Sequence, residues 1–319
     1  MTSTEQDRFR FDVRSYIVYL GFLVVFVFFA VTLRDTGFLT LDNFMSIVRQ
    51  SAPIAVMAVG MAFVLSAGEI DLSIGSVVAL SALTAALILS STGNLFLAVG
   101  STLAVGVLIG LFNGLATVSL RVPSFLVTLG TMSIVAGLAR GVTGLDAVPV
   151  THAEFNFWFG SGSIGPLSIL LLWAFVVATV GHFLYRNTKF GRRVLATGGD
   201  PLAATALGIH IKRVKVAVLI MSSTLAALAG MLYAGRLHGA RYTLGDADLL
   251  TVIAATVVGG TSLFGGRGSI VGAVAGALLM GMLNNGLVIM GLSVSEQLVA
   301  RGLVIIVAVA LSLRGPRDQ

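Results

Sequence analysis

Long apolar stretches, separated by short polar or glycine-rich breaks, run along almost the whole sequence. A membrane-spanning helix needs about 20 consecutive, mostly apolar residues. Stretches of this length recur throughout the chain, and each predicts one α-helical span. About ten spans are predicted in all, which makes the chain an all-α, polytopic transmembrane protein. The predicted spans lie near residues 15–33, 43–67, 72–90, 95–119, 124–140, 166–185, 213–236, 248–264, 269–290 and 297–313.

The composition supports this class. Of the 319 residues, 56% are hydrophobic and 11% are charged, whereas a soluble globular domain carries about 25% charged residues. The chain therefore has too few charges to cover a surface that faces water on every side, and we treat residues 1–319 as one transmembrane domain. The 38 glycines suit close contact between helices in lipid. Since the sequence has no cysteine, disulfides and thiolate metal sites are excluded.

The basic residues predict the orientation of the spans. With ten spans and a cytoplasmic N-terminus, 14 of the 20 Lys and Arg residues fall on the cytoplasmic side, and the positive-inside rule then places both termini in the cytoplasm. The net charge of +6 does not indicate nucleic-acid binding, because no basic run is interleaved with stacking aromatic residues. The cytoplasmic set is Arg8, Arg10, Arg14, Arg121, Arg186, Lys189, Arg192, Arg193, Lys212, Arg213, Lys215, Arg267, Arg314 and Arg317.

The basic cytoplasmic loop 186–215 contains the signals of a short helix. Asp200 is a good N-cap, Pro201 suits the first helical position, and Gly208 suits a left-handed C-cap. The pattern predicts about two helical turns whose apolar face is covered by nothing in the chain. A docking surface for a partner explains this better than a solvated connector. The predicted docking residues are Gly199, Asp200, Pro201, Ala203, Ala204, Leu207 and Gly208.

A polar break, Gly68 to Gly75, separates two apolar spans and carries two acidic residues. Ionisable residues at membrane depth indicate function, although Asp71 and Ser73 can also cap the next helix. We favour a break that forms a gate over direct binding of substrate. Asparagines within apolar spans either bond between helices or line a polar pathway. The gate and pathway candidates are Glu69, Asp71, Ser73, Asn113, Asn284 and Asn285.

The glycine-rich segment 259–269 does not predict a nucleotide site, because no strand precedes it and no Lys-Ser/Thr pair follows. It predicts a tight turn between closely packed helices. The scattered histidines form no metal pair, and no nucleophile elbow is present, so we expect neither catalytic nor metal-binding residues. The predicted packing glycines are Gly265, Gly266, Gly268, Gly272 and Gly276.

A weak internal repeat relates residues 110–115 to residues 281–287. Each copy is followed by a short break and another apolar span. If each half of the chain has five spans, the halves must be inverted, as in many transporters.

Four stretches, residues 68–76, 121–131, 191–209 and 259–279, carry a resemblance that extends over essentially the whole chain. The sequence resembles the permease subunits of ATP-binding-cassette sugar importers, in the ribose/xylose/galactoside branch. The resemblance implies a bacterial inner-membrane permease that pairs with a second permease, a cytoplasmic ATPase and an extracytoplasmic sugar-binding protein. It implies that the helix between Asp200 and Gly208 is the coupling helix. ATP and magnesium would bind the partner ATPase, so this chain would have no cofactor and no enzymatic activity of its own.

The sequence departs from the family at one position, because related permeases usually carry an acidic residue after the coupling-loop proline and here Leu202 follows Pro201. Branched-chain amino-acid permeases share the fold, but the stretch from Ile70 to Ser73 fits the sugar branch better. The main alternative is an ion-coupled secondary transporter, which needs intramembrane ionisable groups. Its candidates are Glu69, Asp71, Asp248 and Arg301. A membrane-embedded enzyme ranks below both.

Overall fold

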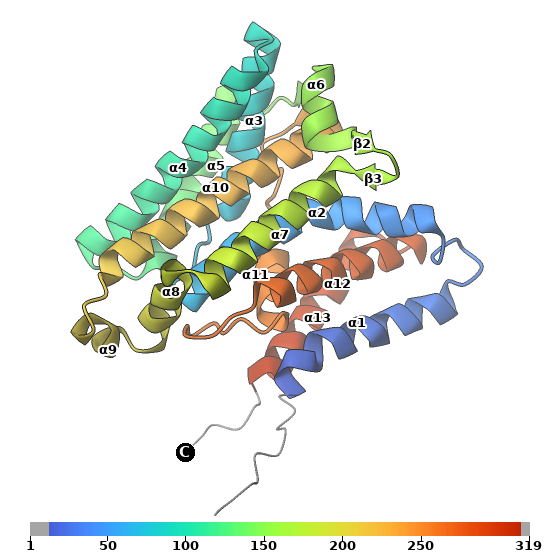
Figure 1. Ribbon diagram of the computed structural model, residues 1–319. Coiled ribbons are helices and arrows are strands. Elements are labelled where there is room, and N and C mark those ends of the chain that lie inside the picture. The colour runs from blue at the N-terminus through green and yellow to red at the C-terminus, as the bar shows by residue number, and fades with distance from the viewer. Residues whose placement is uncertain (1–12, 314–319) are drawn as a thin grey trace, which may run out of the picture.

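The computed structural model describes residues 13–313, and helices dominate this part of the chain (Figure 1). The helices are α1 (Val13–Thr32), α2 (Leu41–Ser66), α3 (Ile74–Thr92), α4 (Leu95–Leu120), α5 (Ser124–Thr143), α6 (Ala153–Asn156), the π-helix η1 (Phe157–Ser161), α7 (Ile169–Asn187), α8 (Lys189–Gly199), α9 (Pro201–Ala206), α10 (Ile211–Leu237), α11 (Asp248–Val258), α12 (Ile270–Ile289) and α13 (Val294–Leu313).

The strands are only two residues long and lie at one end of the bundle (Figure 1). They are β1 (Val148–Pro149), β2 (Ser163–Ile164), β3 (Leu167–Ser168) and β4 (Gly239–Ala240), and β1 pairs with β4 while β2 pairs with β3, both antiparallel. The β1–β4 pair ties the loop after α5 to the end of α10, so it fixes this end of two long helices.

Seven helices in the described part are long and apolar enough to cross a membrane: α2, α3, α4, α5, α7, α10 and α12. These confirm seven of the predicted spans, and each begins and ends within three residues of its predicted bounds. The other three predicted spans fall on α1, α11 and α13, so the predicted count of ten is not established. The chain is an all-α, polytopic membrane protein.

The predicted span 248–264 differs most from the structure. α11 has 11 residues, which is about 16 Å of helix, whereas the hydrocarbon core of a bilayer is about 30 Å thick. The helix ends at Val258 because Gly259 and Gly260 follow, and Gly260 has a left-handed backbone with φ of +92°. Residues 261–269 then form a loop instead of the last turns of a helix.

α10 lies at the centre of one group of helices and packs against α2, α3 and α4 (Figure 1). Its contact with α4 depends on a glycine stripe at Gly106, Gly110 and Gly114. A Cβ at Gly110 would lie 2.5 Å from the Cα of Ile220, so only glycine permits this approach of the two backbones.

α1, α2, α7, α11 and α12 form a second group, and α2 connects it to the first group through its contact with α10. The described chain begins in α1 and ends in α13 at the end of the bundle that carries α8 and α9 (Figure 1). We call this the basic end.

Of the predicted cytoplasmic cations, Arg8, Arg10, Arg314 and Arg317 lie outside the described residues. The predicted inverted repeat stays a prediction.

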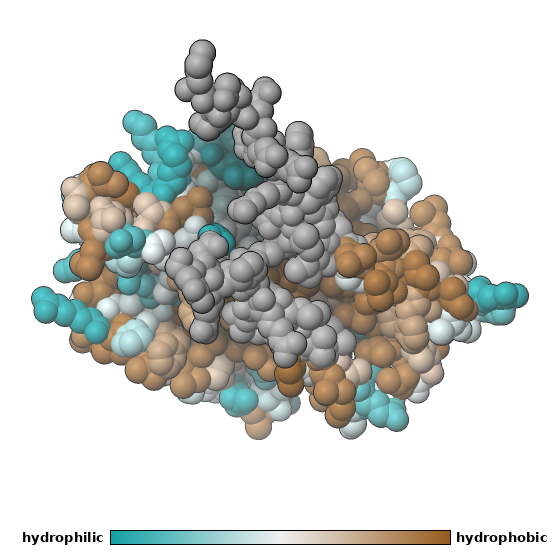
Figure 2. All heavy atoms as spheres, turned by 90° about the horizontal axis from the view of Figure 1, so that it is seen from below, coloured by the Kyte–Doolittle hydropathy of each residue, from teal (hydrophilic) through white to brown (hydrophobic). Residues whose placement is uncertain are grey.

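The outer surface is largely hydrophobic where it is visible from the basic end (Figure 2). Hydrophilic side chains form separate groups rather than a continuous cover. α4, α5 and α7 contribute many of the exposed large apolar side chains, among them Leu108, Phe112, Leu129, Leu138, Phe175 and Val180. Such exposure is what lipid contact requires and what water would penalise.

The glycines near α12 have two different roles. Gly272 and Gly276 confirm the predicted helix packing, because a Cβ at either position would overlap backbone atoms of Gly259 or Ala255 around α11. Gly265, Gly266 and Gly268 lie in the predicted tight turn, between α11 and α12, where a Cβ at each would crowd atoms at the ends of α8, α2 or α7. Gly265 and Gly266 have positive φ angles and let this loop approach the end of α8.

Replacing Gly276 with valine should destabilise the fold strongly, because the new side chain would overlap the Ala255 carbonyl and neither backbone can move away easily. Overpacking of this kind typically costs about 1–3 kcal/mol and sometimes more. The thermal transition of the detergent-purified chain reports the change. Gly130→Val is the matched control, since a Cβ at Gly130, also in a membrane helix, meets nothing within 4 Å. Equal transitions for the two variants would contradict the packing assignment.

Candidate functional site

The polar break begins where α2 ends in a glycine cap. The N–H of Gly68 donates to the carbonyl of Leu65 (2.9 Å) and the N–H of Glu69 to that of Val64 (3.1 Å). This is the Schellman pattern, which needs a left-handed residue at Gly68, whose φ is +76°. Residues 69–73 then have no regular secondary structure before α3 starts at Ile74. The sequence therefore produces a helix–break–helix unit, as predicted.

Asp71 is fully buried and organises the break. Its Oδ1 accepts hydrogen bonds from the backbone N–H of Ser73 (3.0 Å) and from the Ser73 hydroxyl (2.6 Å). Asn113 of α4 donates to the oxygen of the same hydroxyl (3.0 Å). The predicted capping of α3 by the Ser73 side chain is wrong, since that hydroxyl is directed to Asp71 instead. Three of the predicted gate residues thus form one buried network.

The first turns of α5 hold the backbone of the break from the other side. Ser124 Oγ accepts from the N–H of Ile70 (3.0 Å). Thr128 Oγ1 accepts from the N–H of Leu72 (3.1 Å) and donates to the carbonyl of Ile70 (3.2 Å). These bonds satisfy backbone groups that have no helical partner, as buried polar groups require. They also couple any movement of the break to α5.

Glu69 connects the break to α10. It forms an ion pair with Lys215 in the second turn of that helix. The Glu69 side chain is only 5% exposed, while that of Lys215 is 30% exposed. Because a buried carboxylate without a partner is costly, the pair fixes the break against the first part of the helix that follows the basic loop.

The basic loop contains two helices, of which the sequence predicted only the second. α8 starts at the N-cap Thr188, whose Oγ1 accepts from the N–H groups of Phe190 and Gly191. It buries Val194, and Phe190 stacks on Phe63 of α2 at 5.9 Å between ring centroids. The spacing of Phe190 and Val194 is the amphipathic signal that could have revealed this helix.

α9 has the predicted caps. Asp200 Oδ1 accepts from the N–H groups of Leu202 (2.9 Å) and Ala203 (3.0 Å), and Pro201 is the first helical residue. At the other end the N–H of Ile209 donates to the carbonyl of Ala204 (3.0 Å), beside a left-handed Gly208. This is a second Schellman ending, so the six-residue helix is held at both ends by local bonds.

The faces of α9 differ from the prediction at one position. Ala204 is 2% exposed and packs inward, so it does not belong to a docking surface. The exposed apolar residues are Leu202 (85%) and Leu207 (80%), and Phe264 of the α11–α12 loop is 79% exposed. Leu202 and Phe264 are absent from the predicted docking set, although their apolar character in polar loops was a usable signal.

The basic loop is joined closely to the rest of the basic end. The N–H of Gly266 donates to the carbonyl of Ser66 at the end of α2 (3.0 Å). A Cβ at Gly198 would overlap that same carbonyl and would lie 2.8 Å from the nitrogen of Gly266. The end of α8, the end of α2 and the α11–α12 loop are therefore in direct backbone contact.

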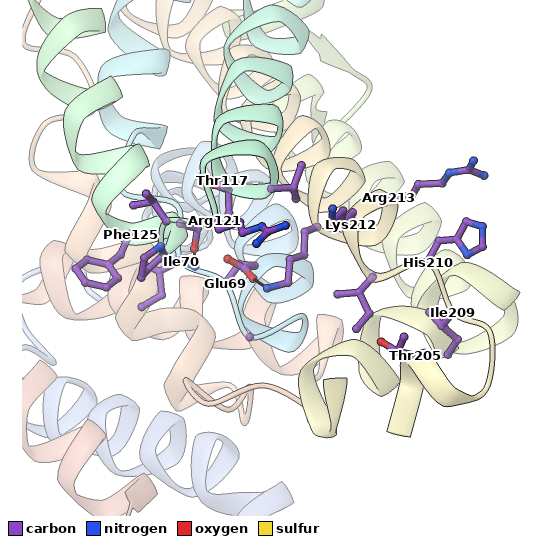
Figure 3. A pocket seen from close by; sticks show the side chains of 17 residues that line it. Glu69, Ile70, Thr117, Arg121, Phe125, Thr205, Ile209, His210, Lys212 and Arg213 are labelled. Carbon is purple, nitrogen blue, oxygen red and sulfur yellow. Dashed lines mark hydrogen bonds and ion pairs between the residues drawn. The ribbon is translucent and has the colours of Figure 1, made fainter. Parts of the chain in front are cut away.

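A cavity of about 890 Å³ opens between the break, the α4–α5 turn and the loop after α9. Figure 3 shows Glu69 and Ile70 on one side of it, Thr117 and Arg121 from the end of α4 above, and Thr205 from α9 below. The cavity thus lies between the predicted gate and the predicted coupling helix. We take the break, the cavity and α9 together as the candidate functional site.

Asn284 and Asn285 do not join this site. Asn285 donates to the side-chain oxygen of Asn43 near the start of α2 (2.9 Å), whereas the break follows the end of α2, and 26 residues of helix are about 39 Å long. α2 and α12 run antiparallel, so their asparagines meet at the opposite end. Asn285 therefore hydrogen-bonds α12 to α2 and is not part of the gate.

Replacing Asp71 with alanine should impair both stability and transport, because it removes the acceptor of two Ser73 hydrogen bonds at a fully buried position. A buried donor left without its acceptor typically costs about 1–3 kcal/mol. Asp71→Asn is the matched control, since it keeps an acceptor at Oδ1. Thermal stability and transport should fall for the alanine variant and stay closer to wild type for asparagine. Wild-type behaviour of Asp71→Ala would contradict this role.

The fold and the site define a polytopic membrane transport subunit with a structured loop at its basic end. The chain belongs to the family described as "Branched-chain amino acid transport system / permease component", whose model matches residues 43–309. This confirms the class inferred from the four motif stretches.

Individual relatives match over nearly the full length. The chain is 40% identical to the ribose import permease protein of Bacillus subtilis (strain 168), covering 97% of this chain and 96% of that protein. It is 35% identical to the L-arabinose ABC transporter permease protein of Azospirillum brasilense, covering 93% and 86%. It is 34% identical to the galactose/methyl galactoside import permease protein of Escherichia coli (strain K12), covering 95% of each. No solved structure matches the chain significantly.

Proposed function

We propose that this chain is the membrane-spanning permease subunit of an ATP-driven importer for a monosaccharide or related polyol. The observation that carries the proposal is the capped helix α9, which exposes Leu202 and Leu207 beside the polar break. Relatives whose names state ribose, arabinose or galactose transport match over nearly the whole chain and support sugar over branched-chain amino acids.

The partners follow from this role. A cytoplasmic ATPase would dock on a surface formed by Leu202, Leu207 and Phe264, which we call the α9 surface, and would hold ATP and magnesium. A second permease subunit and an extracytoplasmic sugar-binding protein would complete the importer in a bacterial inner membrane. Ten spans, with both termini and the basic loop in the cytoplasm, are the topology that fits this arrangement.

The geometry gives a route from docking to gating. α9 continues through a short turn into α10, whose Lys215 holds Glu69 of the break. The same break is bonded to α5 and α4 through Thr128 and Asn113. When two ATPase subunits close on ATP, a displacement of α9 would reach the break through this ion pair, and also through the contact of Gly198 with the end of α2. Residues 68–73 would then act as the gate of the pathway.

Reconstitution in proteoliposomes tests this function. The permease, its ATPase and its binding protein are combined, and uptake of labelled ribose, arabinose or galactose is measured with ATP on the ATPase side. Uptake should require ATP, and it should be insensitive to ionophores. Uptake without ATP that collapses with an ion gradient would support a secondary transporter instead. The buried ion pair and hydrogen bonds of Glu69 and Asp71 give these carboxylates structural partners and favour the ATP-driven mechanism.

A further inference from the structure

The cavity at the basic end has a cationic rim that the proposed transport mechanism does not use. Arg121, Lys212, Arg213 and Lys215 line it, and Glu69 is the one acidic residue among its described lining residues. Glu69 is already paired with Lys215. Within residues 13–313, no acidic side chain lies within salt-bridge distance of Arg121, Lys212 or Arg213. The rim therefore carries uncompensated positive charge from two different helix ends.

An apolar groove leads away from this rim along the outside of the bundle. It has a volume of about 370 Å³ and lies between α4 and α10, where Leu115, Val118, Val216, Ala217 and Ile220 line it. Lys212 and Arg213 line both the groove and the cavity, as does Val118. The two hollows therefore share one cationic mouth.

The position of the groove favours a lipid over a soluble protein as its occupant. From Arg213 to Ile220 the groove follows α10 for seven residues, about 10 Å along a helix apolar enough to span the membrane. A cytoplasmic protein cannot reach that depth, whereas an acyl chain lies there. Figure 3 shows Arg121 and Lys212 close to the cavity, with Arg213 directed outward along its edge.

We propose that this site binds one anionic phospholipid. Arg121, Lys212 and Arg213 hold its phosphate at the rim, and one acyl chain fills the groove between α4 and α10. Basic pockets between membrane helices on the cytoplasmic side are suited to such head groups. The lipid would lie against the first turn of α10, next to the ion pair of Lys215 with Glu69.

Native mass spectrometry of the purified chain tests the proposal by titration with phosphatidylglycerol or phosphatidylcholine. Phosphatidylglycerol should bind the wild type selectively. The variant Lys212→Gln/Arg213→Gln should bind it about 30-fold more weakly, since each of the two basic residues near the surface contributes about 1 kcal/mol. The matched control is Lys189→Gln/Arg192→Gln, which removes the same charge from exposed positions of α8 outside the cavity.

A separate variant tests whether an acyl chain occupies the groove. Val118→Trp keeps the charge and fills the shared mouth of the groove, so it should weaken phosphatidylglycerol binding, while inorganic phosphate at millimolar concentration should not displace the lipid. Displacement by phosphate would leave only an anion site. Equal binding of both lipids, equal binding by the two glutamine variants, or release of the lipid when the ATPase is added would overturn the proposal. No transport is measured, so this outcome is independent of the proposed function.

Discussion

Replacing Leu202 and Leu207 of the α9 surface with aspartate should abolish ATP-driven uptake and leave the permease folded. Both side chains are largely exposed, at 85% and 80%, so neither replacement opens a cavity within the chain. The caps that form α9 use Asp200 and Gly208 and stay intact. Placing two charges in an apolar interface should weaken ATPase binding at least tenfold, because burying an unpaired charge costs several kcal/mol.

Copurification of the ATPase with the permease and uptake in proteoliposomes measure the two consequences separately. The control is Leu202→Met/Leu207→Met, which keeps the surface apolar and should retain both activities. Normal uptake by the aspartate variant would show that α9 is not the docking site. Loss of uptake with normal ATPase binding would show that α9 transmits movement but does not provide affinity.

The apolar residue at position 202 bears on which chemistry the partner ATPase presents there. Related permeases are expected to carry an acid after the coupling-loop proline, and this chain presents an exposed leucine there instead. An apolar contact can replace a surface ion pair at little cost, since exposed ion pairs contribute only about 0–1 kcal/mol. We therefore expect the partner ATPase to present an apolar groove rather than a cation at this position.

The features that the sequence predicted correctly depend on nearby residues. The ends of α9 follow from Asp200, Pro201 and Gly208, which act through bonds within a few positions. The seven established spans follow from the length of apolar runs. The break follows from Gly68, which ends α2 in the same way that Gly208 ends α9. Local signals of this kind need no knowledge of tertiary structure.

The features that the sequence did not predict depend on residues far apart in the chain. Nothing in the spacing of Asn113 and Asn285 shows that one meets Ser73 and the other Asn43, because that depends on how α4 and α12 run through the bundle. The ion pair of Glu69 with Lys215 is of the same kind. α11 was predicted too long because Gly259 interrupts an apolar run that otherwise continues.

That ion pair is the second strong test of the site. Removing either partner should reduce uptake at least tenfold and destabilise the permease, because an uncompensated buried charge costs about 3–5 kcal/mol. The two single variants should differ in stability. Lys215→Met leaves the Glu69 carboxylate without a partner at a position that is 5% exposed. Glu69→Gln instead leaves Lys215 without a partner, but this side chain is 30% exposed and can be hydrated. Lys215→Met should therefore be the more damaging change.

The double exchange Glu69→Lys/Lys215→Glu distinguishes the attraction between the two side chains from the effect of which residue stands at each position. If the attraction between the side chains connects α10 to the break, the exchange should recover part of both stability and uptake, with a coupling energy of about 0.5–3 kcal/mol in the double-mutant cycle. Arg192→Met, an exposed cation of the same basic end, is the control and should change neither quantity. Additive losses in the double variant would contradict the connection. Recovery of stability without uptake would place the pair in folding alone, and the path from α9 to the gate would then have to run through Ser66 and the contact of Gly198 with Gly266.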